Sequence, residues 1–231
     1  MVSVIIPARN EAARIAATVR AASLIPGVGE IIVVDDGSRD GTADEATRAG
    51  ATVVRMGKAA GKGQALQRGI ETSRGEILLL LDADLGDTAI HAEHLLAPVL
   101  AREADMAIAQ FAPRGASGGG FGLVVRLARW AIRRATGKVM NSPLSGQRAL
   151  RRQVWIETGP IEPGFGAEVG LTITALRSGF RVQEILLPMT HRVTGWDFAA
   201  IWHRAKQFYA VARTLLRLAI RRTARTDARH S

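Results

Sequence analysis

The sequence predicts a single α/β domain with a mostly parallel central sheet and helices on both of its faces. Short apolar runs alternate with helical stretches through the first half of the chain, the order typical of strands joined by crossover helices. Polar clusters follow directly after three of these runs. Because the carboxyl ends of parallel strands share one edge of a sheet, we expect the three clusters to lie together there. The 231 residues, of which 47% are hydrophobic, are enough to bury a sizeable core.

The elements of the first half follow from apolar runs and the residues that interrupt them. We expect strands at residues 2–6, 30–34, 51–55 and 76–81, and helices at 10–23, 42–48 and 61–73. Asn10 is expected to cap the first helix with its side chain, and Gly50 and Gly75 to end the next two. The run 30–34 is apolar without alternation, as in strands that are buried on both faces.

The second half of the chain is less regular. We expect helices at 91–102, 121–136 and 166–177, and strands at 106–110, 144–150 and 182–187. Residues 113–120 are rich in glycine, which favours either a lid that orders over a bound ligand or a passive surface loop. A final amphipathic helix is expected at 197–222, capped by Asp197 and followed by a basic tail at 223–231.

Residue usage and charge limit the ligands that the protein can bind. There is no cysteine, so a metal would be held by oxygen or imidazole, which favours Mg²⁺ or Mn²⁺. Residues 203–231 contain eight Lys and Arg and one acidic residue, so they hold +7 of the net charge of +10. The rest of the chain is nearly balanced. We therefore expect no nucleic-acid partner, and we expect the tail either to be solvated or to meet an anionic membrane surface.

The amino terminus and the hydropathy pattern indicate where the protein works. Residues 1–7 carry no basic segment of the signal-peptide kind and read instead as a strand. No uncharged apolar run reaches the roughly 18 residues that a membrane-spanning helix needs. These observations favour a cytoplasmic protein, either soluble or peripheral at the inner face of the membrane.

Asp82 and Asp84 are the strongest candidates for a functional site. They follow the most apolar of the expected strands and are separated by a single residue, Ala83. Carboxylates in this place can bind a hard divalent cation together with the diphosphate of a ligand, and the cation offsets the charge of a departing diphosphate. An isolated D-x-D triplet is most often a solvated turn, but its position after a buried strand favours the functional interpretation.

Two further clusters are expected at the same edge of the sheet. Asp35 and Asp36 follow the strand at 30–34, where a carboxylate can accept hydrogen bonds from a base or a ribose hydroxyl. Gly61 and Lys62 open a helix whose backbone N–H groups and ammonium can meet a base or a diphosphate. A turn with a helix cap is the structural alternative for both clusters.

Four stretches, in this order, resemble the family-2 glycosyltransferases and their relatives with the GT-A fold: VIIPARNE at 4–11, VVDDGSRDGT at 33–42, GKG at 61–63 and LDAD at 81–84. The resemblance is specific over about the first 110 residues. It implies a GT-A-like fold and a nucleotide-sugar donor, with a UDP-sugar favoured over a GDP-sugar. It implies that the donor is bound by Pro7, Ala8, Arg9, Glu11, Asp36, Lys62, Asp82 and Ala83. It also implies that Asp84 is a metal ligand and part of the catalytic machinery.

Residues 162–170 are similar to the acceptor-side segment of glucosyl-3-phosphoglycerate synthases, a retaining branch. In inverting relatives a carboxylate in this region is the general base, which makes Glu168 a catalytic candidate; a charge at a helix start is its structural alternative. GT-A enzymes often take a third metal ligand from a histidine near the end of the fold, which points to His191. Gln147 and Arg148 are expected on the acceptor side, with Arg148 available to a phosphate.

These features together predict metal-dependent sugar transfer to a hydroxyl or phosphate of a small-molecule or lipid-phosphate acceptor. Inversion is favoured by the first half, and the segment around Glu168 keeps retention open. One domain is expected over 1–222, with a nucleotide-sugar half at 1–110, an acceptor half at 111–196 and a helix at 197–222. A sugar nucleotidyltransferase is the main rival, although such enzymes have a glycine-rich loop after the first strand. A non-catalytic, membrane-recruited nucleotide-binding protein is a second rival, and a homodimer is compatible with the sequence.

Overall fold

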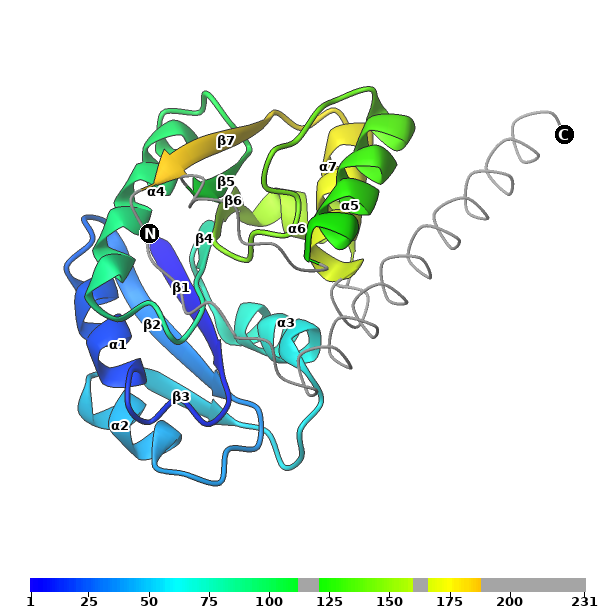
Figure 1. The fold of residues 1–231 in the computed structure, drawn as a ribbon. Helices are drawn as coiled ribbons and strands as arrows, with labels where there is room; N and C mark the ends of the chain where they lie inside the picture. The colour runs from blue at the N-terminus through cyan, green and yellow to red at the C-terminus, as the bar shows by residue number, and fades with distance from the viewer. Residues whose placement is uncertain (112–120, 160–165, 188–231) are drawn as a thin grey trace, which may run out of the picture.

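A computed structural model of the protein describes residues 1–111, 121–159 and 166–187. Within them, seven strands form one sheet in the order β3-β2-β1-β4-β6-β5-β7 (Figure 1). The strands are β1 (Val2–Ala8), β2 (Val28–Asp35), β3 (Thr52–Arg55), β4 (Ile77–Leu80), β5 (Met106–Phe111), β6 (Arg148–Arg151) and β7 (Val182–Leu187). Four of the strand pairs are parallel, and β6 runs antiparallel to both of its neighbours. The predicted α/β fold with a mostly parallel sheet is confirmed.

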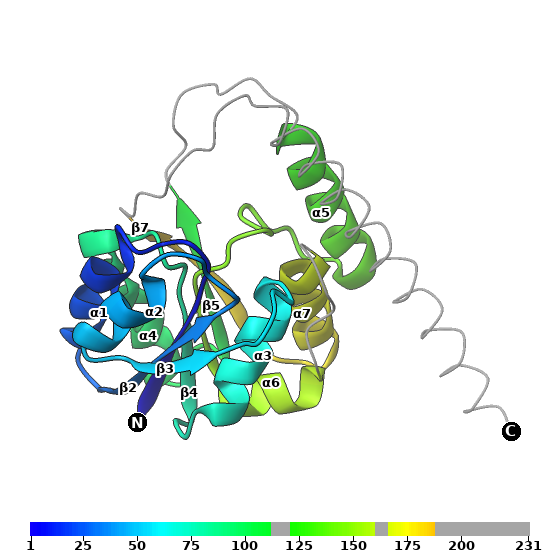
Figure 2. The ribbon, with the colours of Figure 1, turned by 90° about the horizontal axis from the view of Figure 1, so that it is seen from below.

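Helices cover both faces of this sheet (Figures 1 and 2). One face is covered by α1 (Ile15–Ser23), α2 (Thr42–Arg48), the 3₁₀ helix η1 (Gly86–Ala92) and α4 (Glu93–Leu100). The other face is covered by α3 (Lys62–Thr72), α5 (Phe121–Thr136), α6 (Arg152–Thr158) and α7 (Gly166–Arg177). None of the described helices is long and apolar enough to cross a membrane.

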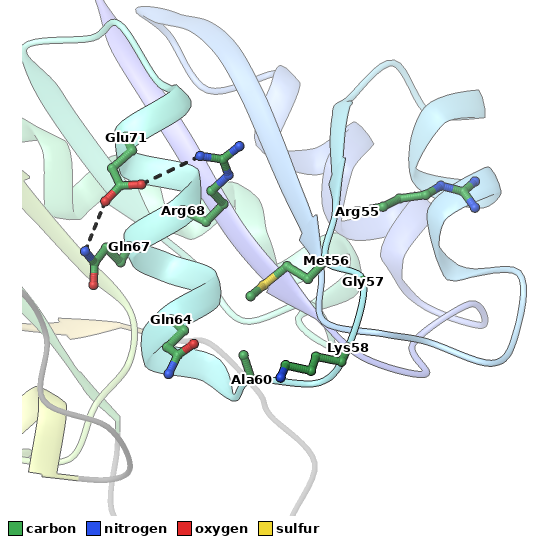
Figure 3. Close-up of a pocket in the computed structure, with 9 residues that line it drawn as sticks. All are labelled: Arg55, Met56, Gly57, Lys58, Ala60, Gln64, Gln67, Arg68 and Glu71. Atoms are coloured by element: carbon green, nitrogen blue, oxygen red, sulfur yellow. Dashed lines mark hydrogen bonds and ion pairs between the residues drawn. The ribbon is translucent and has the colours of Figure 1, made fainter.

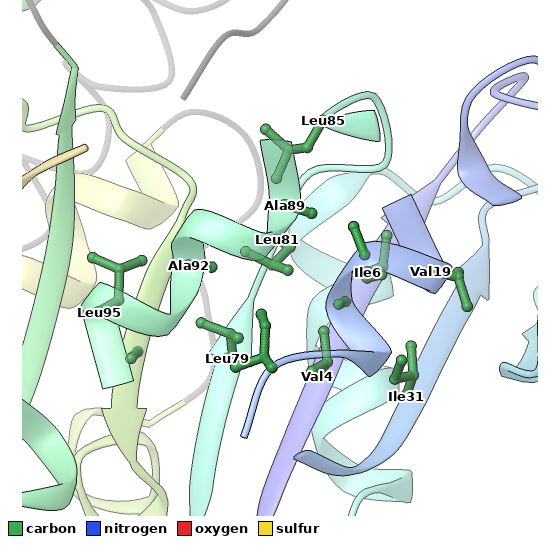
Figure 4. Close-up of a cluster of buried hydrophobic side chains, with 14 of the residues drawn as sticks. Val4, Ile6, Val19, Ile31, Leu79, Leu81, Leu85, Ala89, Ala92 and Leu95 are labelled. Atoms are coloured by element: carbon green, nitrogen blue, oxygen red, sulfur yellow. The ribbon is translucent and has the colours of Figure 1, made fainter. Parts of the chain in front are cut away.

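Alternation along the strands divides the buried side chains into two cores. Val4 and Ile6 of β1 pack on the side of α1 and α4, together with Leu79 and Leu81 (Figure 4). Ile5, between them, points to the opposite face and packs with α3. Each such side chain stabilises the fold by roughly 1.5–3 kcal/mol on burial. The continuous apolar runs in the sequence are therefore strands that are buried on both faces.

Two local predictions are wrong, and a third element is confirmed with different bounds. The first helix begins at Ile15 instead of at residue 10, because Asn10 takes a positive φ of 57° and its side-chain oxygen accepts a hydrogen bond from the Arg39 N–H at 2.9 Å. The helix expected at 91–102 is η1 followed by α4. The strand expected at 144–150 begins only at residue 148, and α6, which was not predicted, follows it directly.

The direction of β6 determines which segments reach the edge of the sheet where the polar clusters lie. The carboxyl ends of β1, β2 and β4 meet at this edge, and Leu80 at the end of β4 pairs with Arg148 at the beginning of β6. Residues that precede β6 therefore lie beside residues that follow β4. The glycine-rich stretch at 113–120, His191, the helix expected at 197–222 and the basic tail are outside the described residues.

Candidate active site

The three polar clusters predicted from the sequence meet at one edge of the sheet. The Asp36 N–H donates a hydrogen bond to the Ala8 carbonyl at 2.9 Å, which joins the end of β2 to the end of β1. The Arg14 guanidinium, in the loop between β1 and α1, donates to the Asp84 carbonyl at 3.4 Å. The residues that follow β1 are thus flanked by Asp36 on one side and by the D-x-D turn on the other.

The loops that follow β1 and β2 are joined by side-chain hydrogen bonds. The Ser38 hydroxyl accepts from the Asn10 N–H at 3.0 Å, and the Thr42 hydroxyl accepts from the Glu11 N–H at 2.8 Å. Asp35 accepts from the Ser38 N–H at 2.9 Å and so stabilises its own turn. The sequence motifs at 7–11 and 35–42 therefore form one structural unit.

Asp36 organises the loop that leads into α3. Its two carboxylate oxygens accept hydrogen bonds from the backbone N–H groups of Ala60 and Gly61, at 2.6 and 2.9 Å. Gly37 takes a φ of +71°, and a Cβ at this position would lie 3.0 Å from the backbone nitrogen of Ala59. A residue with a side chain would be strained here, because this backbone conformation favours glycine. The buried Asp36 thus fixes the position of the helix start that carries Lys62.

Asp82 is held from two sides. The Lys62 ammonium lies 2.6 Å from one of its carboxylate oxygens, and the Gln147 amide donates to the other oxygen at 2.6 Å. Lys62 comes from α3 and Gln147 from the segment before β6, so three elements meet at this carboxylate. A Cβ at Gly146 would lie 2.5 Å from the Lys62 ammonium nitrogen. Only glycine leaves Lys62 in this place without displacement.

Glu168, in the first turn of α7, lies across from Asp82 on the other side of Lys62. Its carboxylate is buried and one oxygen lies 3.7 Å from the Lys62 ammonium. The second oxygen has no hydrogen-bond partner within the described residues. A buried oxygen without a partner is rare in folded proteins, and a ligand hydroxyl that donates to it would remove the cost.

The charges around Glu168 oppose one another. Burial raises the pKa of the Glu168 carboxyl, although Lys62 and Arg148 act to lower it. Burial alone would lower the pKa of Lys62, but the nearby carboxylates of Asp82 and Glu168 outweigh it, so the net change raises this pKa. Lys62 keeps 39% of its side chain exposed, and the neighbouring carboxylates keep its ammonium charged. The site thus places a cation between the carboxylates of Asp82 and Glu168.

The expectation that Arg148 binds an acceptor phosphate is wrong for the arrangement seen here. Arg148 is only 1% exposed, and its guanidinium donates to the Ser145 carbonyl at 2.9 Å and to the Thr172 hydroxyl at 2.9 Å. Burial lowers its pKa to about 10, against the effect of Glu168 and Glu184. Arg148 is therefore a buried cation beneath the site that supports the turn carrying Gln147.

Asp84 is the described residue best placed to hold a cation. No hydrogen bond to its carboxylate is formed within the part of the chain that the structure describes, and the residue is partly exposed. The buried Thr18 hydroxyl donates to the Ala83 carbonyl at 2.8 Å and accepts from the Gly86 N–H at 2.8 Å, which fixes the turn. Thr18 was not identified from the sequence, because one threonine in an amphipathic helix gives no signal.

The donor set suits a hard cation that keeps ligands from outside the protein. Residues 1–111, 121–159 and 166–187 contain no cluster of three or more His, Asp or Glu side chains that could enclose a metal. A carboxylate with water and diphosphate oxygens is the usual arrangement for Mg²⁺ at a nucleotide. Asp84 fits this chemistry, and His191, the expected third ligand, lies outside the described residues.

A separate groove of about 800 Å³ lies along α3, away from the acidic cluster (Figure 3). It is lined by Arg55, Met56, Gly57, Lys58, Ala60, Gln64, Gln67, Arg68 and Glu71. Its basic residues are largely engaged, since Arg55 pairs with Asp44 at 2.6 Å. The groove shares Ala60 with the loop that Asp36 holds, but neither Asp82 nor Glu168 lines it.

Several solved structures superpose on this chain. Glucosyl-3-phosphoglycerate synthase from Mycobacterium tuberculosis, in complex with Mg²⁺ and UDP, is 30% identical and superposes with a TM-score of 0.77, covering 94% of this chain and 78% of that one. The complex of the same enzyme with Mn²⁺, UDP-glucose and phosphoglyceric acid gives a TM-score of 0.76 at 27% identity, over 93% of this chain and 79% of that one.

Sequence comparison leads to the same group of proteins. The M. tuberculosis H37Rv synthase is 35% identical over 195 residues, which cover 74% of this chain and 60% of that protein. Glycosyltransferase AglJ from Haloferax volcanii is 29% identical over 82% of this chain and 62% of its own length. The chain thus spans about 60% of the length of these curated relatives. A family model described as glycosyl transferase family 2 matches residues 3–159, and the chain belongs to this family.

Proposed function

We propose that this protein is a metal-dependent glycosyltransferase that uses a nucleoside-diphosphate sugar, with UDP-glucose as the first candidate donor. The observation that carries the proposal is the meeting of Asp36, Lys62, Asp82 and Asp84 at the carboxyl ends of adjacent strands, with Glu168 across from them. Similar solved structures contain UDP or UDP-glucose together with Mg²⁺ or Mn²⁺. Sequence family and site geometry thus support the same chemistry.

The donor would lie along the edge formed by β1, β2 and β4. Pro7 and Ala8 end β1, Arg9 and Glu11 follow it, and all four would bind the nucleoside together with Asp36. Ala83 and Asp82 would lie beside the ribose and the sugar. Asp84, with His191 as the further proposed ligand, would hold Mg²⁺ or Mn²⁺. A bound cation supplies charge neutralisation on the departing diphosphate. The Lys62 ammonium adds a fixed positive charge beside that group.

Glu168 would act on the reacting side of the donor. Its buried oxygen without a partner can accept a hydrogen bond from a hydroxyl of the donor sugar or the acceptor. The raised pKa of Glu168 also brings it closer to the range in which a carboxylate takes up a proton at neutral pH. Gln147 orients Asp82 from the acceptor side, and Arg148 stabilises the turn from below.

The stereochemical course has two candidates. The resemblance of the first half predicts inversion, with Glu168 as the general base for the acceptor hydroxyl. Similarity to glucosyl-3-phosphoglycerate synthases over 74% of the chain favours the retaining alternative. Proton NMR of the first product formed separates the two, because the coupling constant of the anomeric proton identifies the configuration before it equilibrates.

Asp84→Asn tests the proposed donor chemistry. Metal-dependent release of nucleoside diphosphate from UDP-glucose is expected to fall by at least about a hundredfold, since charge stabilisation at one group contributes on the order of 10²–10³ in turnover. Asp87→Asn, an exposed carboxylate in η1, is the matched control and should keep its activity. Full activity of Asp84→Asn would contradict the assignment. Pyrophosphate release from a sugar phosphate and a nucleoside triphosphate would favour the nucleotidyltransferase instead.

We also propose an acceptor, a cellular location and a membrane contact for this protein. The acceptor is a hydroxyl or phosphate of a small molecule or a lipid phosphate, and phosphoglycerate, present in solved complexes of the relatives, is the first compound to assay. The protein would work in the cytoplasm, as a monomer or a homodimer. The basic segment at 197–231 would bring it to the inner face of the membrane.

A further inference from the structure

One side of α5 exposes basic and apolar residues together. Five cations lie on this side or just beyond the helix, and two large apolar side chains are exposed among them. The set, called here the α5 face, consists of Arg126, Arg129, Trp130, Arg133, Arg134, Lys138 and Val139. Trp130 is 60% exposed and Val139 is 68% exposed. Residues 121–140 contain no Asp or Glu.

The spacing of these residues makes them one continuous stripe. Within the helix they recur at intervals of three and four residues, which places them on the same side. The opposite side of the helix carries Val124, Ala128 and Ile132, which are buried, and the last two belong to the core that α5 shares with α7. Trp130 is thus excluded from the core, although a tryptophan can remove 150–250 Å² of surface from water when it is buried.

The charges of the α5 face are not neutralised within the described part of the chain. No ion pair there involves any of its five cations, whereas arginines elsewhere, such as Arg48 and Arg181, pair with carboxylates. Arg129 donates to the Asn141 carbonyl, a neutral group, at 2.5 and 3.2 Å. The α5 face therefore presents a compact positive field around an exposed indole.

We propose that the α5 face docks on an anionic lipid bilayer. Basic residues gain on the order of fivefold in affinity each when they approach an anionic membrane surface. Tryptophan favours the boundary between headgroups and acyl chains, and arginine can keep its charge in water while its stem covers apolar surface. Trp130 and Val139 would enter the boundary, and the cations would remain with the lipid phosphates.

Other occupants fit the charge less well. A second copy of the chain carries a net charge of +10, and residues 203–231 of the same chain carry +7, so both are repelled by the α5 face. A nucleic acid would satisfy the arginines, but its phosphate backbone gives Val139 no apolar neighbour. A bilayer supplies anions and apolar groups at the same surface.

The position of α5 gives such docking a consequence for the site. Figures 1 and 2 show α5 at the outside of the molecule, away from α1 and α2. The helix is followed by the segment that contains Asn141. Arg129 donates a hydrogen bond to the Asn141 carbonyl, and the Asn141 N–H donates one to Glu184 of β7. That segment ends at Gln147, beside Asp82. Docking through α5 would therefore bring the acceptor side of the site near the membrane.

Sedimentation with vesicles tests the proposal on the full chain. Binding to vesicles of phosphatidylglycerol and phosphatidylcholine is compared with binding to phosphatidylcholine alone, over a range of salt concentrations. Arg133→Glu with Arg134→Glu is expected to weaken binding to the anionic vesicles by at least about twenty-five-fold, the effect of two lost cations at about fivefold each. Trp130→Ser should reduce the part of the binding that survives high salt.

The matched control reverses two exposed arginines on the far side of the molecule. Arg20→Glu with Arg48→Glu, in α1 and α2, changes the net charge by the same amount and should weaken binding less than about threefold. Equal losses in both double variants would overturn the proposal, because net charge alone would then govern binding. Unchanged binding by the α5 variants would overturn it as well, as would failure of the full chain to bind anionic vesicles, with or without binding to RNA. All variants keep residues 223–231, so a loss cannot be attributed to the tail.

Discussion

The two carboxylates of the D-x-D turn have different surroundings. Both oxygens of Asp82 accept hydrogen bonds, one from the Lys62 ammonium and the other from the Gln147 amide. The Asp84 carboxylate receives none within the described residues, and the turn that carries it is held through backbone groups by Arg14 and Thr18. Asp82 is thus oriented by the protein, whereas Asp84 is left to bind groups that the protein does not supply. This difference supports the proposal that Asp84 is the metal ligand.

Gly146→Ala should disturb the site without unfolding the protein. The new Cβ would meet the Lys62 ammonium, the far end of a flexible side chain, which can shift away from Asp82. We expect turnover of the nucleotide sugar to fall by at least about tenfold, since small displacements of reacting groups are costly. The free energy of unfolding should change by less than about 1 kcal/mol, because an end group that can move avoids most of the overpacking cost.

Gly57→Ala is the control for this prediction, because nothing lies within 4 Å of a Cβ at that position. It should leave both turnover and stability near their original values. Normal activity in Gly146→Ala would show that the contact between Lys62 and Asp82 is dispensable.

Lys62→Met should move the pH dependence of activity. Burial raises the pKa of Glu168 above its usual value of 4.5, and Lys62 opposes that rise. Ionised Glu168 becomes less favourable when the cation is removed, so its pKa rises further. The acid limb of the profile of kcat/KM against pH should therefore shift to higher pH, in addition to a loss of turnover. Lys58→Met, on the loop before α3, should leave the limb in place; a shift of the limb to lower pH in Lys62→Met would contradict the assignment.

Among the elements, α6 stabilises the helix that carries Lys62. Arg152, the first residue of α6, donates to the carbonyls of Ile70 and Ser73 at the end of α3 at 3.2 and 3.0 Å. It also donates to the Gly75 carbonyl at 2.7 Å. Carbonyl groups at the last turn of a helix have no partners inside the helix, and a cation there also complements the helix dipole. The short helix α6, which was not predicted from the sequence, thus stabilises the C-terminal end of α3.

Arg152→Ala should lower the free energy of unfolding by about 2 kcal/mol, because several hydrogen bonds to a charged donor are lost together. Gln153→Ala, the next residue of the same helix, removes only an exposed pair with Glu157 and should cost a few tenths of a kcal/mol. Urea denaturation at neutral pH measures both. Equal stability of the two variants would show that the end of α3 is held by other contacts.

At the scale of the whole molecule, the site lies where the parallel part of the sheet meets the part that contains β6, β5 and β7. The segments that follow β2 and β4 supply Asp36, Asp82 and Asp84, and the segment before β6 supplies Gln147. Glu168 lies in the first turn of α7, which packs against the part of the sheet that contains β5 and β6. A ligand bound between them would contact both parts and stabilise the fold as a unit.

UDP and Mn²⁺ together are therefore expected to raise the Tm. At a concentration of a hundred times Kd, a ligand stabilises the native state by about 2.7 kcal/mol, which for a chain of this size is a shift of about 5–10 °C. EDTA should remove most of the shift, and Asp84→Asn should lose it in the presence of the metal. A larger shift with GDP than with UDP would indicate a guanosine donor.

The sequence predicted the parallel half of the fold well, because apolar runs buried on both faces and the residues that end them are local signals. The meeting of Asp36, Asp82 and Asp84 followed from the rule that parallel strands end at one edge. The burial of Arg148 could not be predicted, since it depends on Thr172 and on carbonyls of the turn that precedes β6. Asn10 was wrongly assigned as a helix cap because its partner, Arg39, is distant in the sequence.

Because β6 runs antiparallel to its neighbours, its two ends lie in different surroundings, and sequence changes at each end have different effects. Its first residue lies beside the site, whereas its last, Arg151, lies at the opposite edge of the sheet, where it contacts Asp105 at 3.2 Å. A segment grafted ahead of β6 would alter the surroundings of Asp82, whereas substitutions at Arg151 would alter mainly the stability of the fold. Changes to the site and changes to stability can thus be made at opposite ends of the four-residue strand β6.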